Sequence, residues 1–247
     1  MSATYPRRLA AEFVGSLLLV CVVVGSGIAA QQLSPGNIGL QLLENSTATV
    51  LGLGVLILVF GPVSGAHLNP VVSVTDWLLG RRRGTGLPGG ELCGYIPAQI
   101  VGAILGSVLA NVMFDLDAVQ VSTHDRSTTG HLVGEIVATA GLIAVILALA
   151  RTGRAALSAA AVAAYIGAAY WFTSSTSFAN PAVTIGRTFS DTFAGISPGS
   201  APGYIAAQIV GAACGLALIT WLYPDIPATT DDVVTHDGAP LAHRSSS

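Results

Sequence analysis

Long apolar stretches alternate with short polar ones along most of the chain. Six stretches hold about 20 residues each, the length that an α-helix needs to cross a hydrocarbon core of ~30 Å. They cover residues 9–30, 43–62, 94–114, 131–150, 155–174 and 202–223. The pattern therefore predicts six transmembrane helices. The first is too long for the apolar region of a cleaved signal peptide, so we expect it to be retained.

Two Asn-Pro pairs interrupt hydrophobic sequence where proline should break a helix. One lies in Ser-Gly-Ala-His-Leu-Asn-Pro-Val-Val (64–72) and the other in Thr-Ser-Phe-Ala-Asn-Pro-Ala-Val-Thr (176–184). Asparagine is a favoured N-cap and proline is best tolerated at the first helical position, so each pair predicts the start of a new helix. From Asn69 to Leu79 that helix would measure about 16 Å at ~1.5 Å per residue, half of the hydrocarbon core. We expect two re-entrant half-helices.

The second half of the chain repeats the first. Tyr-Ile-Pro-Ala-Gln-Ile-Val-Gly-Ala-Ile-Leu-Gly (95–106) matches Tyr-Ile-Ala-Ala-Gln-Ile-Val-Gly-Ala-Ala-Cys-Gly (204–215), and Glu12 corresponds to Glu135. Each half would hold three spans and one half-helix. Because an odd number of spans inserts the two halves upside down relative to each other, the half-helices should meet near the midplane from opposite faces.

Composition supports an all-α membrane protein. The 247 residues are 52% hydrophobic and only 9% charged, with a mean hydropathy of +0.68, which is too little charge for the surface of a water-soluble domain. The polar C-terminal segment has little to bury and is expected to be a disordered tail. The predicted division is an N-terminal segment 1–8, a membrane domain 9–223 with repeats at about 9–114 and 131–223, and the tail 224–247.

All ten basic residues are arginines, and their positions predict the orientation. With six crossings, eight of them fall on one side of the membrane: Arg7, Arg8, Arg81, Arg82, Arg83, Arg151, Arg154 and Arg244. Only Arg126 and Arg187 fall on the other side. Cytoplasmic loops carry an excess of arginine and lysine, so both termini should be cytoplasmic. The net charge of −3 gives no footprint for nucleic acid.

The half-helices suggest a passage for neutral molecules. Each helix N-terminus carries roughly half a positive unit charge, which disfavours cations and hydronium where two N-termini meet. Asn69 and Asn180 can cap with their oxygens while their amide hydrogens face a hydroxylic solute. The irregular segments 65–68 and 177–179 can supply carbonyl acceptors, since such backbone is tolerated in a membrane only along a wet cavity or inside protein. The alternative is a pair of capped re-entrant helices without a pore.

No pattern in the sequence indicates catalysis. The cysteines, Cys21, Cys93 and Cys214, are far apart in or beside apolar runs, so we expect small buried residues without a disulfide or metal role. No nucleophile and base pair or metal cluster appears either. We therefore expect no enzyme, no catalytic residues, no cofactor and no metal.

The double Asn-Pro motif, the repeat, the matched glutamates and Ser-Gly-Ala-His-Leu-Asn-Pro resemble the major intrinsic proteins, the aquaporins and aquaglyceroporins, over about residues 7–223. The resemblance implies an aquaporin-like channel domain of six tilted spans and two half-helices, assembled as a homotetramer with one pore per subunit. The pore motifs it implies are Asn69, Pro70 and Val71, and Asn180, Pro181 and Ala182. Valine 71 stands where the family usually has alanine.

The resemblance also assigns roles to other polar residues. Glu12 and Glu135 would accept hydrogen bonds from the backbone of the re-entrant loops, because unpaired carboxylates are expensive in lipid. His67 corresponds to a histidine near the cytoplasmic pore mouth. A packed or loop-bracing histidine is the alternative reading of His67.

The outer filter of the family has four positions, which fall here at Thr49, Ala168, Ser177 and Val183. A water-selective filter would show bulky aromatics and, at the last position, an arginine. All four residues here are small or medium and uncharged, so a wider opening and a weaker barrier to cations are expected. Arg187 follows Val183 by one helical turn. It either supplies a displaced positive charge at the vestibule or snorkels to the membrane interface.

Thr49 and Val183, together with Asn-Pro-Ala-Val-Thr-Ile-Gly-Arg (180–187), resemble the arsenic-resistance-associated bacterial branch of the aquaglyceroporins. This implies a passive channel in a bacterial-type inner (cytoplasmic) membrane for small uncharged solutes, with arsenous acid, glycerol and water as candidates. A narrower facilitator of glycerol, urea or water is the nearest alternative. An inverted-repeat secondary transporter would need ion ligands or a titratable relay beside the asparagines, and none is evident.

Overall fold

The computed structural model describes residues 3–81 and 86–224, and every regular element in these ranges is helical. In chain order they are α1 (Tyr5–Leu33), α2 (Ile38–Ser64), α3 (Pro70–Gly80), α4 (Gly89–Met113), α5 (Thr129–Arg151), the 3-10 turn η1 (Ala155–Leu157), α6 (Ser158–Phe172), α7 (Pro181–Gly186), the 3-10 turn η2 (Arg187–Phe189) and α8 (Ala201–Leu222). The predicted tail from residue 225 onward lies outside the described residues, as do Arg82, Arg83 and Arg244.

Six of these helices are long and apolar enough to cross a membrane: α1, α2, α4, α5, α6 with its preceding turn η1, and α8. The six predicted spans are confirmed, with ends that differ by a few residues. Helix α1 begins earlier, at Tyr5, with a proline in its first turn, where the missing N–H has no helical partner to lose. Helix α2 continues through Pro62 to Ser64.

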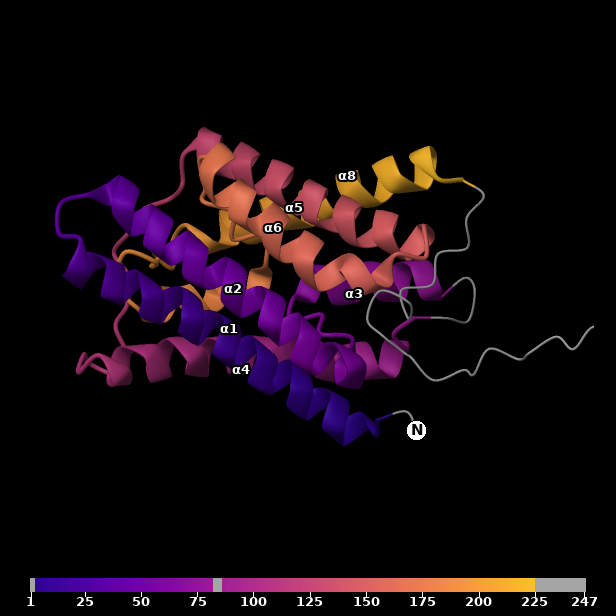
Figure 1. Ribbon diagram of the computed structural model, residues 1–247, viewed down its shortest axis with the longest axis horizontal. Coiled ribbons are helices and arrows are strands. Elements are labelled where there is room, and N and C mark those ends of the chain that lie inside the picture. Colours follow the sequence, from indigo (N-terminus) through magenta and orange to yellow (C-terminus); the bar gives the residue numbers. More distant parts are fainter. Residues whose placement is uncertain (1–2, 82–85, 225–247) are drawn as a thin grey trace, which may run out of the picture.

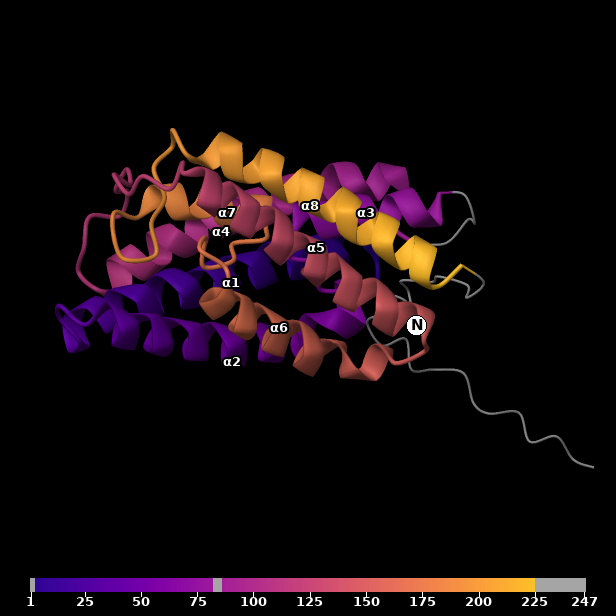
Figure 2. The ribbon, with the colours of Figure 1, turned by 90° about the horizontal axis from the view of Figure 1, so that it is seen from above.

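The two halves of the chain have the same arrangement in opposite orientations. Helix α1 packs along α4 in the first half, and α5 packs along α8 in the second. The start of α1 and the end of α8 lie at the same end of the molecule, which we call the inner end (Figure 1). Half-helix α3 extends toward the inner end, while α7 lies toward the opposite, outer end (Figure 2).

The two half-helices differ in length. Helix α3 has the expected eleven residues, whereas α7 has only six before it tightens into η2. At ~1.5 Å per residue α7 spans only about 9 Å. The expected second half-helix is therefore present but short, and the 3-10 turn η2 and irregular backbone complete the outer part of that loop.

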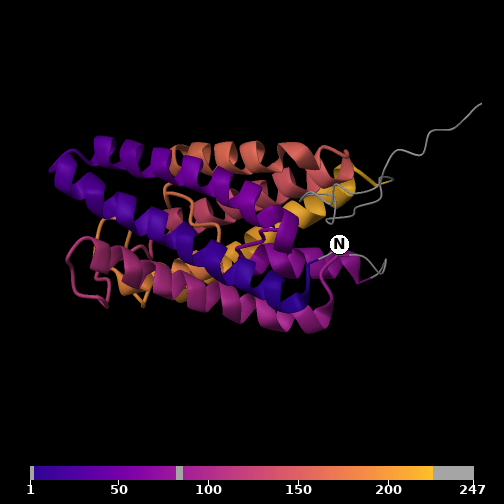
Figure 3. The ribbon, with the colours of Figure 1, turned by 60° about the horizontal axis from the view of Figure 1, so that its bottom comes forward.

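Close helix approach explains the glycines that recur in α4 and α8. A Cβ at Gly106 would lie 2.3 Å from the carbonyl oxygen of Leu17 on α1, and a Cβ at Gly215 would lie 2.3 Å from that of Ala140 on α5. The glycines four residues earlier in each helix make equivalent contacts. Small residues let these backbones touch, so the glycines fix the packing within one subunit. Figure 3 shows α1 lying along α4.

The outward faces of the long helices are apolar and exposed. On α2, Leu51 and Leu58 expose about two-thirds of their surface. Cys21 is buried as expected, but Cys93 and Cys214 are exposed, so the prediction of three buried cysteines is wrong for two of them. The physical reason is that a lipid-facing helix surface accepts small apolar residues as readily as the core does.

Candidate functional site: a cavity between the two half-helices

The side chains of Asn69 and Asn180 join the two re-entrant loops at the centre of the molecule. Asn69 Nδ2 donates a hydrogen bond to the carbonyl of Ala179 at 2.8 Å, and Asn180 Nδ2 donates to the carbonyl of Leu68 at 2.7 Å. Each accepting carbonyl belongs to the residue just before the other asparagine, so the contact is symmetric between the repeats. A side-chain amide has two N–H donors, which leaves each asparagine a second N–H beside this bond.

The asparagines also start the half-helices, as predicted. Asn69 Oδ1 accepts the backbone N–H of Val71 at 3.1 Å, and Asn180 Oδ1 accepts that of Ala182 at 2.9 Å. Pro70 and Pro181 are the first residues of the two helices. Val71 packs in an apolar cluster and Ala182 is fully buried. Neither lines the cavity, so valine in place of alanine in the first motif leaves the cavity wall unchanged.

The backbone just before each asparagine is strained in the same way. Ala66 and Leu68 have φ values of 44° and 48°, and at the matching offsets Ser177 and Ala179 have values of 52° and 48°. A non-glycine residue in this left-handed region costs about 1–3 kcal/mol and persists only where its surroundings enforce it. These loops must therefore be held by other groups.

Glu12 and Glu135 hold the two loops that precede the asparagines. Glu12 accepts the backbone N–H groups of residues 67 and 68 at 3.0 and 2.7 Å, and Glu135 accepts those of residues 178 and 179 at 2.9 Å each. Gln99 and Ser64 also donate to Glu12, and Gln208 also donates to Glu135. Both carboxylates are fully buried, so these donors replace the lost hydration and fix the loop backbone in place.

A cavity of about 110 Å³ runs between the half-helices and the surrounding spans, which is room for several water molecules. The two asparagines and the loop segments 65–69 and 177–180 line one side of it. Helices α1, α2, α5 and α6 contribute mainly aliphatic side chains to the other walls. The passage therefore combines a polar track with an apolar surface.

The spacing of residues on α6 decides which of them reach the cavity. Val162, Ile166 and Tyr170 line it at intervals of four residues, so they share one helix face. Ala168 is about 200° around the helix from Ile166 and is exposed on the outside. Ala168, which counting along the chain assigned to the filter, therefore does not line the cavity. Tyr170 lies there instead, and extending the four-residue stripe would have identified it.

The other three expected filter residues do line the cavity. Thr49, Ser177 and Val183 are all buried and belong to its wall. The Tyr170 hydroxyl lies 3.2 Å from Thr49 Oγ1, within hydrogen-bond distance. Helix α6 is thereby joined to α2 at this level, and an aromatic ring stands where four small residues were expected.

Arg187 also lines the cavity, one helical turn beyond Val183. Only 2% of its surface is exposed. Its Nε donates to the carbonyl of Ala194, and its guanidinium carbon lies 3.4 Å from the centre of the Phe178 ring. A residue so enclosed does not snorkel to the membrane interface, so that alternative is wrong. A positive charge is present at the outer end although residue 183 is valine.

Two irregular segments cover the outer end. Asp191 accepts the backbone N–H of Thr123 at 2.8 Å, and Arg126 Nε donates to the carbonyl of Gly195 at 2.8 Å. The hydrogen bond from the Thr123 backbone lowers the pKa of Asp191 below its ordinary value. These bonds join the segment after α4 to the one after η2, and so support the loop that carries Arg187.

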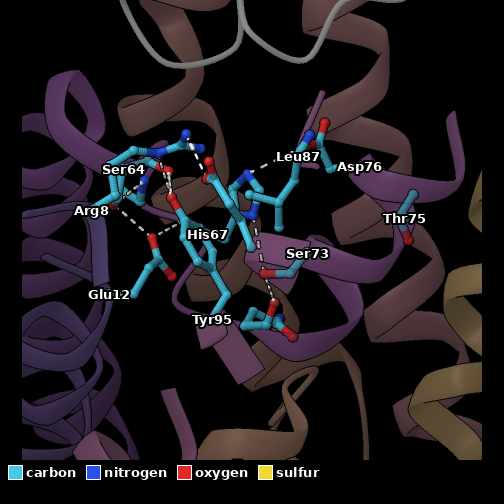
Figure 4. Close-up of polar contacts among 12 residues, drawn as sticks. Arg8, Glu12, Ser64, His67, Ser73, Thr75, Asp76, Leu87 and Tyr95 are labelled. Atoms are coloured by element: carbon cyan, nitrogen blue, oxygen red, sulfur yellow. Dashed lines mark hydrogen bonds and ion pairs between the residues drawn. The ribbon is translucent and has the colours of Figure 1, made fainter. Parts of the chain in front are cut away.

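At the inner end, His67 both lines the cavity and is braced. Its Nδ1 lies 3.0 Å from Ser73 Oγ, its ring packs edge-on against Tyr95, and its Nε2 lies 4.0 Å from Asp76 Oδ2 (Figure 4). Asp76 Oδ2 also accepts the backbone N–H of Leu87 at 2.7 Å. Asp76 belongs to no motif that predicts a role for it, yet this residue is buried and lines the cavity.

These groups suit the passage of a neutral molecule better than a reaction. Amide N–H groups and carbonyls offer donors and acceptors along one side, and aliphatic walls face them. Among residues 3–81 and 86–224, no three histidine, cysteine, aspartate or glutamate side chains gather as a metal site would require. A solute with hydroxyl groups and an apolar or compact body fits this lining.

Comparison with known proteins agrees with this geometry. The family described as "Major intrinsic protein" matches residues 1–179. Aquaglyceroporin AqpS of Rhizobium meliloti (strain 1021) is 47% identical over 216 residues, covering 87% of this chain and 90% of that protein. Probable aquaporin AqpM of Archaeoglobus fulgidus is 29% identical over 248 residues, covering 90% and 98%. The X-ray structure of the aquaglyceroporin from Plasmodium falciparum has a TM-score of 0.60 at 20% identity, covers 90% of this chain and 96% of its own, and supports the fold.

Proposed function

Because the chain belongs to the major intrinsic protein family, whose members are passive membrane channels and not enzymes, we propose that it conducts small neutral hydroxylated solutes, with arsenous acid, glycerol and water as candidate permeants. The observation that carries this proposal is the two-sided cavity. Hydroxyl groups of a solute would bond to the asparagine amides and loop carbonyls, while the rest of the solute would pass along the aliphatic walls. Arsenous acid is neutral at neutral pH and has the hydroxyl groups of a small polyol.

The central asparagines favour neutral solutes over cations. The N-termini of α3 and α7 meet at Asn69 and Asn180, and the positive ends of two helix dipoles raise the energy of a cation there. The remaining N–H of each asparagine is a donor for a solute oxygen. A sodium- or proton-coupled transporter would instead need ligands for its coupling ion near these residues.

The proposed outer filter consists of Thr49, Tyr170, Ser177, Val183 and Arg187. Val183 has a smaller side chain than the arginine of a water-selective filter, so the opening at the filter is wider than in a water-selective channel. Arg187 retains a positive charge one turn farther out, next to Phe178 in the loop. This arrangement would admit a polyol while still repelling cations.

We also propose a homotetramer in the inner (cytoplasmic) membrane, with both termini in the cytoplasm and the lipid bilayer around it. The orientation rests on the arginines. Among the described residues, Arg7, Arg8, Arg81, Arg151 and Arg154 belong to the start of α1 or to the segments at the ends of α3 and α5, whereas Arg126 and Arg187 belong to the segments before α5 and after α7. This imbalance matches the bias of cytoplasmic loops. Crosslinking in native membranes and protease protection of a C-terminal tag test both points.

Stopped-flow light scattering on proteoliposomes tests the permeants directly. Wild-type protein should accelerate the flux of water, glycerol and arsenous acid above protein-free vesicles, and imposed proton or sodium gradients should leave the solute flux unchanged. Val183→Arg should lower glycerol and arsenous acid flux about tenfold or more while reducing water flux less, because it narrows the filter.

Each failure has a distinct meaning. Flux that follows the sodium or proton gradient would indicate a secondary transporter. Water flux without solute flux would indicate a water channel, and flux equal to that of empty vesicles would indicate a non-conducting protein. An unchanged profile in Val183→Arg would overturn the filter assignment alone.

A further inference from the structure

The segment that follows η2 holds Arg187 at the outer end of the cavity. Arg187 Nε donates to the carbonyl of Ala194. Ala194 is fully buried against α1, where a Cβ added at Gly27 would lie 3.1 Å from the Ala194 Cβ. The position of the Arg187 guanidinium therefore depends on where the Ala194 carbonyl points, and a group that fixes this segment also fixes the charge.

A second arginine binds the carbonyls on either side of that one. Arg126, in the segment between α4 and α5, donates from Nε to the carbonyl of Gly195 at 2.8 Å and from Nη2 to the carbonyl of Phe193 at 3.2 Å. Two guanidinium groups thus bind three successive carbonyls. Because a guanidinium presents its N–H donors in a rigid planar fork, its contact with both neighbours restrains the backbone of Ala194 between them.

The two arginines also share one aromatic ring. The guanidinium carbon of Arg126 lies 5.4 Å from the centre of the Phe178 ring, compared with 3.4 Å for Arg187. Phe178 is buried and packs edge-on against Tyr204, with 5.0 Å between the ring centres. Arg126 itself is half-buried and does not line the cavity. Its contacts therefore reach the passage through the backbone and the ring that also hold Arg187.

We propose that Arg126 is a positioning residue for the charge of Arg187. By holding the carbonyls of Phe193 and Gly195, it keeps the Ala194 carbonyl, and with it the Arg187 guanidinium, at the outer end of the passage. The proposal rests on the function proposed above, and it makes the exclusion of cations depend on the segment between α4 and α5. Neutral solutes carry no charge for Arg187 to repel, so their passage depends on Arg126 much less.

The test is the potassium or proton leak of proteoliposomes, measured beside their glycerol permeability. Arg126→Ala should raise the leak about 3- to 10-fold, because a charge that moves away from the passage repels a cation less. Its glycerol permeability should stay within about twofold of the wild type, since one lost backbone contact outside the cavity leaves the lining in place. Arg126→Lys keeps the charge but not the planar fork, so it should leak nearly as much as Arg126→Ala.

The double variant separates positioning from a direct effect of the Arg126 charge. If Arg126 acts through Arg187, Arg126→Ala combined with Arg187→Ala should leak within about twofold of Arg187→Ala alone, because coupled residues are not additive. Thr123→Ala is the matched control: it removes a side-chain hydrogen bond to Asp191 between the same two segments and changes neither arginine. Its leak should equal that of the wild type.

Several results would overturn the positioning role. A wild-type leak in Arg126→Ala or Arg126→Lys would do so, as would a further rise in the double variant, which would show that Arg126 repels cations by its own charge. An equal rise in Thr123→Ala would show a general loosening of the outer segments instead. Should Arg126→Ala fail to fold, Arg126→Lys with and without Arg187→Ala carries the same comparison. Wild-type protein without glycerol flux would contradict the proposed function, so the two failures are distinguishable.

Discussion

The guanidinium carbon of Arg187 lies 3.4 Å from the centre of the Phe178 ring, so a residue at the end of the second half-helix is clamped against the irregular segment that precedes it. The pair is a cation–π contact in a buried setting, where such contacts contribute about 2 kcal/mol. It fixes a positive charge at the outer end of the cavity. The charge is therefore held in place although the residue after the second Asn-Pro-Ala is valine.

Removal of this charge should let cations through. A unit charge about 4 Å from a passing cation contributes about 4 kcal/mol at an effective dielectric of 20, so Arg187→Ala should raise proton or potassium leak at least about tenfold. The leak is measured in proteoliposomes with a pH-sensitive dye. Arg187→Lys, which keeps the charge, should leak much less, and equal leak in all three proteins would show that Arg187 does not guard the passage.

Tyr170 should set the size limit for solutes. Its hydroxyl contacts Thr49 and its ring lines the cavity, so Tyr170→Ala should raise the permeability of four- and five-carbon polyols several-fold relative to glycerol. Ala168→Leu is the matched control, because Ala168 is exposed on the other side of α6. If Ala168→Leu restricts polyols and Tyr170→Ala has no effect, Ala168 is the filter residue after all.

The loop-holding glutamates should matter for folding. The Glu135 carboxylate accepts two backbone N–H groups. In Glu135→Gln the side-chain amide would place an NH₂ donor against one of them, so we expect the free energy of unfolding to fall by about 1–3 kcal/mol. Thermal unfolding in detergent measures it. Glu91→Gln removes a partly exposed ion pair with Arg8 and should change the midpoint little, since such pairs contribute about 1 kcal/mol or less. Similar midpoints for both variants would contradict the role of Glu135.

The glycine contact between α4 and α1 should tolerate no side chain. Gly106→Ala places a Cβ 2.3 Å from the Leu17 carbonyl oxygen and should lower stability by about 1–3 kcal/mol, because the helices must move apart. Gly90→Ala, in the same helix but with open space around it, serves as the control. A Gly106→Ala protein as stable as Gly90→Ala would show that α1 and α4 are less closely packed than described.

The outer loops should loosen in acid. The folded pKa of Asp191 lies below the ordinary value of 3.8 because Thr123 donates to its charged form. A lowered folded pKa adds stability that is complete above the ordinary pKa and is lost as the pH falls through the folded one. Proteolysis of residues 115–128 by an acid-active protease should therefore increase below about pH 4, and Asp191→Asn should be cleaved equally at pH 3 and pH 6. Cleavage of the wild type that does not depend on pH would contradict this.

Much of the fold followed from local patterns. Apolar length set the six spans, because only a helix of about 20 residues satisfies its backbone across a membrane. The Asn-Pro pairs set the starts of α3 and α7, and their caps are as expected. The repeat gave the inverted pairing of helices, and it also placed Glu12 and Glu135 where they hold matching loops.

The residues that line the two ends of the cavity were decided only by the tertiary structure. Counting along the chain assigned Ala168, but the irregular segment between α6 and Asn180 does not preserve helical phase, so Tyr170 faces the cavity instead. The sequence does not show whether Asp76 and Arg187 are buried or exposed, and the packing of the helices buries both. The sequence by itself determined that this chain is a helical membrane protein with two half-helices that begin at asparagines, since those signals are local. The residues that line the cavity at each end depend on loops with left-handed backbone. Carboxylates that are distant in the sequence stabilise these loops, and no local sequence pattern specifies such a long-range contact.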